Sequence, residues 1–97
     1  VPDIIRELQE YGAEVLVHDP LAEPEEAHVE YKLHLCDWKD LTNLDALILA
    51  VSHREYLDMG LARLLAPLRK KSQGVLIDVK ACLDPAQVPS TVRYWRL

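Results

Sequence analysis

The fold is decided by the stretch Asp45-Ala46-Leu47-Ile48-Leu49-Ala50-Val51-Ser52-His53-Arg54-Glu55-Tyr56, in which a bare apolar run passes directly into a polar helix start. A short apolar run without alternation is typical of a strand that is buried on both faces of a parallel sheet. Ser52 and Glu55 have the spacing of a capping box, so we expect Ser52 to cap the helix that follows. Ligands of open α/β sheets bind outside the carboxyl ends of the strands, which makes this junction a candidate site.

The rest of the chain repeats this alternation of strands and helices. Further strands are predicted at 15–20, 32–36, 74–80 and 91–97, with the last as an edge strand, and further helices up to Tyr11, over 24–30 and between Ser52 and Pro67. Gly60 interrupts the last of these, so we expect two short helices or one bent helix there. The pattern predicts a Rossmann-like three-layer α/β/α sandwich with a mostly parallel sheet, formed by one domain over residues 1–97.

The chain opens inside an amphipathic helix, whereas a βαβ unit would place a strand before it. We therefore interpret Val1 as a fragment boundary and expect the first strand of the sheet to be missing. A sheet with such a gap has unpaired backbone groups that attract other chains. The isolated chain is expected to be poorly stable or to self-associate, and a pure assembly module stays an alternative function.

Composition narrows the function classes. The chain has 97 residues and a net charge of −5, which argues against a nucleic-acid partner or an anionic membrane surface. No apolar run approaches the roughly 20 residues of a membrane span. Two cysteines fit a reducing, cytoplasmic location, and no metal site is predicted because His34 and Cys36 lack a second ligand pair at a suitable spacing.

Several stretches, taken together, resemble the C-terminal, UDP-binding domain of the UDP-glucose/GDP-mannose dehydrogenase family. They are Asp3-Ile4-Ile5-Arg6-Glu7-Leu8, Val17-His18-Asp19-Pro20, the run from Asp45 to His53, Leu76-Ile77-Asp78-Val79-Lys80 and Tyr94-Trp95-Arg96-Leu97. The ending and the histidine at position 53 are most similar to the bacterial branch that oxidises UDP-N-acetylhexosamines for surface polysaccharides.

This resemblance implies a cytoplasmic, homodimeric oxidoreductase that uses NAD to oxidise C6 of a UDP-sugar, either UDP-N-acetylglucosamine or UDP-N-acetylgalactosamine. In the family, NAD and the catalytic cysteine belong to an N-terminal domain outside this chain, and neither Cys36 nor Cys82 lies in a matching motif. The chain is therefore expected to hold no catalytic and no cofactor-binding residue, and to be inactive alone.

Three residues are the candidate substrate-binding residues. The resemblance puts a basic residue near the substrate at Lys80, which could pair with a diphosphate or be an ordinary surface lysine. Ser52 could bind the ligand or only cap a helix, and His53 could donate to phosphate or sugar or simply pack. Ala81 stands where the family commonly has glycine.

A receiver-type phosphoacceptor domain is the alternative reading from a different class. Such domains use a doubly wound sheet with an acid, a hydroxyl and a lysine at successive strand ends, for which Asp37, Ser52 and Lys80 are available. The short polar segment before Asp37 and the absence of visible paired metal-binding acids argue against it.

Overall fold

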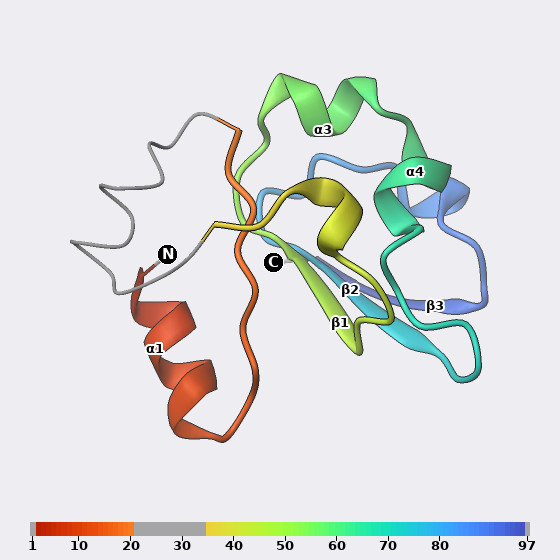
Figure 1. Ribbon diagram of the computed structural model, residues 1–97. Helices are drawn as coiled ribbons and strands as arrows, with labels where there is room; N and C mark the ends of the chain where they lie inside the picture. The colour runs from red at the N-terminus through yellow and green to blue at the C-terminus, as the bar shows by residue number, and fades with distance from the viewer. Residues whose placement is uncertain (1, 21–34, 97) are drawn as a thin grey trace. The chain divides into compact units, whose positions relative to one another are not determined.

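The computed structural model describes residues 2–20 and 35–96, which fall into two compact units, Val1–Leu41 and Thr42–Leu97 (Figure 1). The prediction of one domain over the whole chain stays a prediction, and the helix expected at 24–30 lies outside the described residues.

The first unit begins with the predicted helix, α1, over Pro2–Glu10. Its end follows from the sequence, because Gly12 adopts a φ of +90° and the amide of Ala13 donates to the carbonyl of Leu8 at 3.0 Å. The predicted apolar stripe is only partly covered: Leu8 is half-buried, whereas Tyr11 is 91% exposed.

The strand predicted at 15–20 is wrong in extent. Val17 forms a single parallel bridge with Leu35, supported by a hydrogen bond of 2.8 Å from the Cys36 amide to the Val17 carbonyl. A ladder needs repeated pairing with a neighbouring strand, and within residues 2–20 and 35–41 the pairing does not extend beyond this bridge. The strand expected at 32–36 lies mostly outside the described residues, and a 3₁₀ turn over Trp38–Asp40 follows it.

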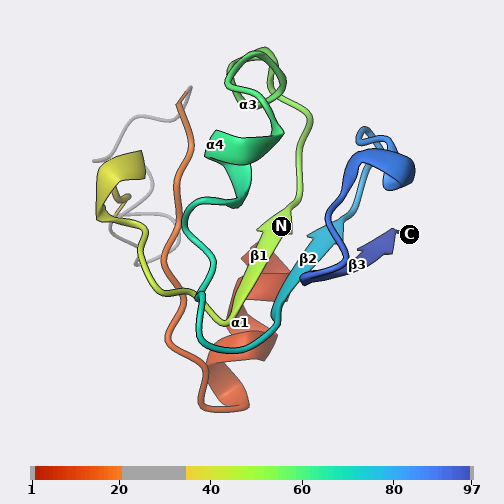
Figure 2. The same cartoon turned by 90° about the vertical axis from the view of Figure 1, so that its right-hand side faces the viewer.

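The second unit is built on a three-stranded parallel sheet in the order β1-β2-β3, with strands Ala46–Leu49, Gly74–Asp78 and Val92–Arg96 (Figure 2). All three were predicted from the sequence, and β3 lies at an edge as expected. β1 and β2 are shorter than predicted, and β2 ends at Asp78, before Lys80. Asn43 precedes β1 and adopts a φ of +54°.

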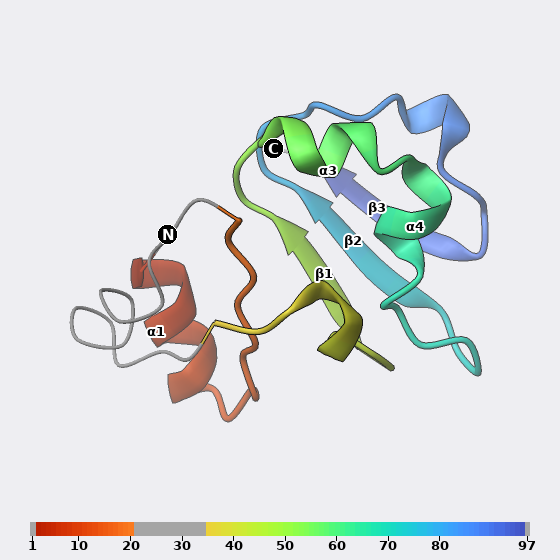
Figure 3. The same cartoon turned by 45° about the horizontal axis from the view of Figure 1, so that its top comes forward.

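Two short helices connect β1 to β2, which confirms the first of the two expected arrangements. They are α3 over Arg54–Asp58 and α4 over Leu61–Leu65, separated by Gly60 at a φ of +84° (Figure 3). The predicted capping box is wrong. His53, not Ser52, is the N-cap of α3, and its side chain makes no capping hydrogen bond. The helix therefore begins one residue later than a serine cap would require, so Glu55 is out of register for the reciprocal bond.

The core of this unit lies between α4 and one face of the sheet. Leu65, Leu68 and Leu76 form its centre, and Leu76 on the central strand is fully buried. Leu47 on β1 and Val92 and Tyr94 on β3 pack against this centre. The mixed α/β class with a parallel sheet is confirmed. The third layer of the sandwich stays a prediction.

Within the described residues, no helix has the length and apolar character needed to cross a membrane.

Candidate functional site

The carboxyl edge of the sheet brings the candidate binding residues of two strands to the same side. β1 and β2 are parallel neighbours with Leu49 opposite Asp78, and the Val79 amide donates to the Leu49 carbonyl at 3.0 Å. Ser52 follows β1 and Lys80 follows β2, and both side chains are exposed. Parallel strands end at one edge, so Ser52 and Lys80 both lie at the carboxyl edge of this sheet.

His53 lies between Ser52 and α3 and is half-buried. Its ring centroid is 5.8 Å from that of Tyr56, one turn further along, in a tilted arrangement. Tyr56 is buried, so the imidazole is packed on one side by a fixed aromatic ring. This contact is the packing role that the sequence left open for His53.

Asp78, the last residue of β2, is the most unusual group at this edge because its carboxylate is fully buried. The amides of Cys82 and Leu83 donate to its two oxygens at 3.1 and 2.9 Å, and the Tyr94 hydroxyl donates to Oδ2 at 2.7 Å. A buried carboxylate without such donors would be strongly unfavourable. The turn that carries Lys80 is thus folded around a satisfied, buried charge.

These contacts set the protonation of the cluster. Burial acts to raise the pKa of Asp78, but hydrogen bonds from Tyr94, Leu83 and Cys82 outweigh it and hold that pKa below the ordinary value. Burial and the hydrogen bond to Asp78 raise the pKa of Tyr94 to about 12. Burial also raises the pKa of the Cys82 thiol, with Asp78 adding to the effect. At neutral pH the cluster therefore holds a carboxylate, a phenol and an unreactive thiol.

The importance of Asp78 and Tyr94 was missed from the sequence. One signal was available: alternation along β2 puts Asp78 on the same face as Gly74 and Leu76, the face that is buried. The sequence could not identify Tyr94 as the side-chain donor to Asp78, because this contact depends on the parallel register that places Tyr94 opposite Leu76.

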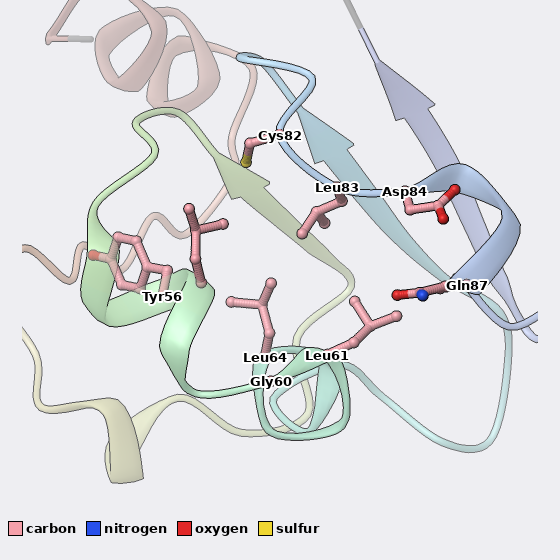
Figure 4. A pocket seen from close by; sticks show the side chains of 9 residues that line it. Tyr56, Gly60, Leu61, Leu64, Cys82, Leu83, Asp84 and Gln87 are labelled. Carbon is pink, nitrogen blue, oxygen red and sulfur yellow. The ribbon is translucent and has the colours of Figure 1, made fainter.

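A cavity of about 370 Å³ lies beside this turn, between the two short helices and the segment after β2. Figure 4 shows Tyr56, Leu61 and Leu64 on the helical side facing Leu83 and Gln87 on the other. Cys82 and Leu83 therefore contribute to the cavity wall and, through their amides, to the shell of Asp78.

The structure gives no support to the alternative of a receiver-type phosphoacceptor domain. Asp37 precedes the 3₁₀ turn in the first unit, with an exposed side chain that makes no capping bond. Among residues 2–20 and 35–96 there is no group of three or more potential metal ligands, and His34 lies outside them.

A parallel sheet with polar residues gathered at its carboxyl edge is consistent with the Rossmann-like class of α/β domains, which bind ligands at that edge. Comparison with known families makes this specific. Residues 1–85 match the model of the UDP-glucose/GDP-mannose dehydrogenase family, UDP binding domain, and the chain belongs to that family. The match includes the junction after β1 and Lys80, whereas β3 lies beyond it.

Curated relatives agree with this assignment. The chain is 40% identical over 86 residues to a UDP-N-acetyl-D-glucosamine 6-dehydrogenase of Pseudomonas aeruginosa, covering 87% of the chain and 19% of that protein. It is 33% identical over 94 residues to the protein CapL of Staphylococcus aureus, covering 97% of the chain and 22% of that protein. A Salmonella typhi UDP-N-acetyl-D-glucosamine 6-dehydrogenase is 31% identical over 85 residues, which cover 88% of the chain and 20% of that protein. The chain thus spans about a fifth of their length. No solved structure matches it significantly.

Proposed function

We propose that the chain is the UDP-sugar-binding part of a cytoplasmic, NAD-dependent UDP-N-acetylhexosamine 6-dehydrogenase that supplies uronic acids for bacterial surface polysaccharides. The observation that carries the proposal is the family match over residues 1–85. The names of two relatives, both UDP-N-acetyl-D-glucosamine 6-dehydrogenases, support this substrate class. UDP-N-acetylgalactosamine remains the other substrate to be tested.

In this proposal Lys80 binds the diphosphate. Its side chain is exposed at the carboxyl edge of the central strand, where an ammonium group acts as a point charge toward phosphate oxygens. Because the site is open to solvent, its attraction for the ligand should weaken as salt rises. The hydroxyl of Ser52 and the imidazole of His53, at the end of the neighbouring strand, provide donors to phosphate or sugar.

The residues present do not fit NAD. A dinucleotide loop needs glycines that let the backbone approach the pyrophosphate, but the segment from β1 to α3 has none, and the chain contains only Gly12, Gly60 and Gly74. The helix after β1 is also only five residues long. The proposed NAD site and catalytic groups therefore belong elsewhere in the enzyme, and the chain by itself should form no NADH from UDP-sugars and NAD.

The decisive experiment is calorimetric titration of UDP into the complete natural polypeptide, comparing the wild type with Lys80→Ala. Losing a charge-assisted contact to phosphate should weaken binding roughly tenfold or more. Lys70→Ala is the matched control, because Lys70 is also exposed but lies before β2, at the opposite end of that strand. Equal UDP affinity in wild type and Lys80→Ala would remove Lys80 from the site.

The substrate and the assembly are tested on the same polypeptide. NADH formation with UDP-N-acetylglucosamine and with UDP-N-acetylgalactosamine identifies the sugar by the ratio of the two kcat/KM values. The proposal also includes a homodimer, which light scattering would report as twice the mass of one polypeptide.

A further inference from the structure

The turn after β2 is held from inside by one carboxylate. Asp78 accepts hydrogen bonds from the amides of Cys82 and Leu83, at 3.1 and 2.9 Å, and lies 3.5 Å from the Cys82 thiol. Lys80 therefore lies in a turn that begins at Asp78 and ends at Cys82 and Leu83. The amides of the last two residues are hydrogen-bonded to the Asp78 side chain. Such a closed turn has few alternative conformations, provided the carboxylate stays in place.

The neighbouring strand holds the same turn at two points. The Tyr94 hydroxyl donates to Asp78 Oδ2 at 2.7 Å, and Arg96 Nη2 donates to the Ala81 carbonyl at 3.3 Å. Tyr94 and Arg96 are two residues apart on β3, so their side chains leave the same face of the sheet. One strand thus fixes both the carboxylate that organises the turn and the backbone next to Lys80.

The conformation held in this way is not one that the chain adopts readily. Ala81 has a φ of +52°, in the left-handed region that is unfavourable for a residue with a Cβ. Surrounding contacts must maintain such a conformation. Here the bonds from Leu83, Tyr94 and Arg96 are the contacts that do so, and Lys80 directly precedes the strained residue.

We propose that Tyr94 and Asp78 are positioning residues, which fix the turn so that Lys80 presents its ammonium group at the carboxyl edge of the sheet. Neither residue needs to touch the ligand, since Asp78 is fully buried and the Tyr94 hydroxyl is bonded to it. The inference rests on the proposed function, in which Lys80 binds the diphosphate. It extends the site to residue 94, outside the 1–85 match to the family.

The test is a double-mutant cycle on UDP affinity in the complete natural polypeptide. Its members are wild type, Tyr94→Phe, Lys80→Ala and the double variant. Tyr94→Phe keeps the ring and removes only the donor to Asp78. We expect it to weaken UDP binding about threefold or more, and to have no further effect once Lys80 is alanine. Tyr11→Phe, at a 91% exposed tyrosine, is the matched control and should leave affinity unchanged.

The cycle separates positioning from general destabilisation, because a smaller folded fraction would weaken the apparent UDP affinity by the same factor with lysine or alanine at position 80, whereas a positioning effect requires Lys80. Arg96→Gln is a second variant that loosens the same turn; Arg96 is exposed, so the core stays intact. It should show the same dependence on Lys80. Rescue is also expected: Ala81→Gly, which removes the backbone strain, should restore part of the affinity lost in Tyr94→Phe.

Each failure has its own signature. If Lys80→Ala leaves UDP affinity unchanged, the proposed role of Lys80 is wrong, and so is the positioning role of Tyr94 and Asp78. If Lys80→Ala weakens binding but Tyr94→Phe and Arg96→Gln do not, only the positioning role is overturned. Losses that add in full on the Lys80→Ala background would likewise overturn it, because they would not act through Lys80.

Discussion

Tyr94 on β3 donates its hydroxyl to the buried Asp78 on β2 at 2.7 Å, and this bond joins the edge strand to the turn beside the candidate site. The two residues lie on neighbouring parallel strands, with Tyr94 opposite Leu76 and therefore two residues short of Asp78 along the ladder. The bond crosses the sheet diagonally and couples the stability of β3 to the shape of the turn that carries Lys80.

Removing this bond should destabilise the second unit. Tyr94→Phe deletes one of the donors to a buried charge, and a hydrogen bond to a charged group contributes about 1.5–3 kcal/mol. We expect a loss of about 1.5 kcal/mol in the free energy of unfolding, measured by urea denaturation followed by circular dichroism. Tyr11→Phe should change it by less than about 0.5 kcal/mol, as is usual at the surface. Equal midpoints for the two variants would contradict the prediction.

The same bond predicts how stability depends on pH above neutrality. The pKa of Tyr94 rises from 10.0 to about 12 in the folded chain, so folding favours the protonated phenol. Its contribution is complete below pH 10 and is lost as the pH rises from 10 toward 12. Urea midpoints measured across this range should fall in the wild type, and this fall should be smaller in Tyr94→Phe.

In acid, we expect the contribution of Asp78 to stability to fall as the pH decreases. Its pKa lies below the ordinary 3.8 when folded, so folding favours the carboxylate. The contribution is present above pH 3.8 and is lost as the pH falls through the lower folded value. In Asp78→Asn, the urea midpoint plotted against pH should fall less steeply in acid than in the wild type. The turn should also be less stable at neutral pH, because an amide accepts these hydrogen bonds less well than a carboxylate. An unchanged acid branch in that variant would show that other carboxyl groups cause the loss.

Ala81 offers a stabilising substitution. Its φ of +52° is easy for glycine and unfavourable for alanine by about 1–2 kcal/mol, of which the greater freedom of unfolded glycine offsets a part. Ala81→Gly should therefore raise the free energy of unfolding by about 0.5 kcal/mol. Ala66→Gly, at an exposed residue with a helical φ of −55°, is the matched control and should lower it. A fall in both variants would contradict the assigned backbone conformation.

The strands of the second unit could be predicted because β1 and β2 are short apolar runs bounded by turn residues, and because side chains alternate along β3. The runs around Leu47, Leu76 and Tyr94 became β1, β2 and β3 within two residues of the expected bounds. The presence of Ser52 and Lys80 at one edge follows from the parallel pairing of β1 and β2.

Other features depended on contacts that a sequence pattern does not contain. The capping box had the right spacing, but the helix starts after His53, so the spacing of Ser52 and Glu55 alone did not determine where the helix begins. The strand predicted around Val17 had the right composition but only one bridging partner among the described residues. Asp78 was read as part of a motif, and its burial depends on a register between distant strands.

A substitution at Leu76 tests whether the centre of β2 forms the core of the second unit. The side chain is fully buried at the centre of β2, in contact with the cluster formed with Leu65 and Leu68. Leu76→Ala removes apolar contacts and leaves a cavity, so the free energy of unfolding should fall by about 3 kcal/mol. Leu57→Ala is the matched control, because Leu57 is 44% exposed and should lose less than about 1 kcal/mol. Similar losses for the two leucines, measured by urea denaturation, would mean that the centre of β2 does not form the core of this unit.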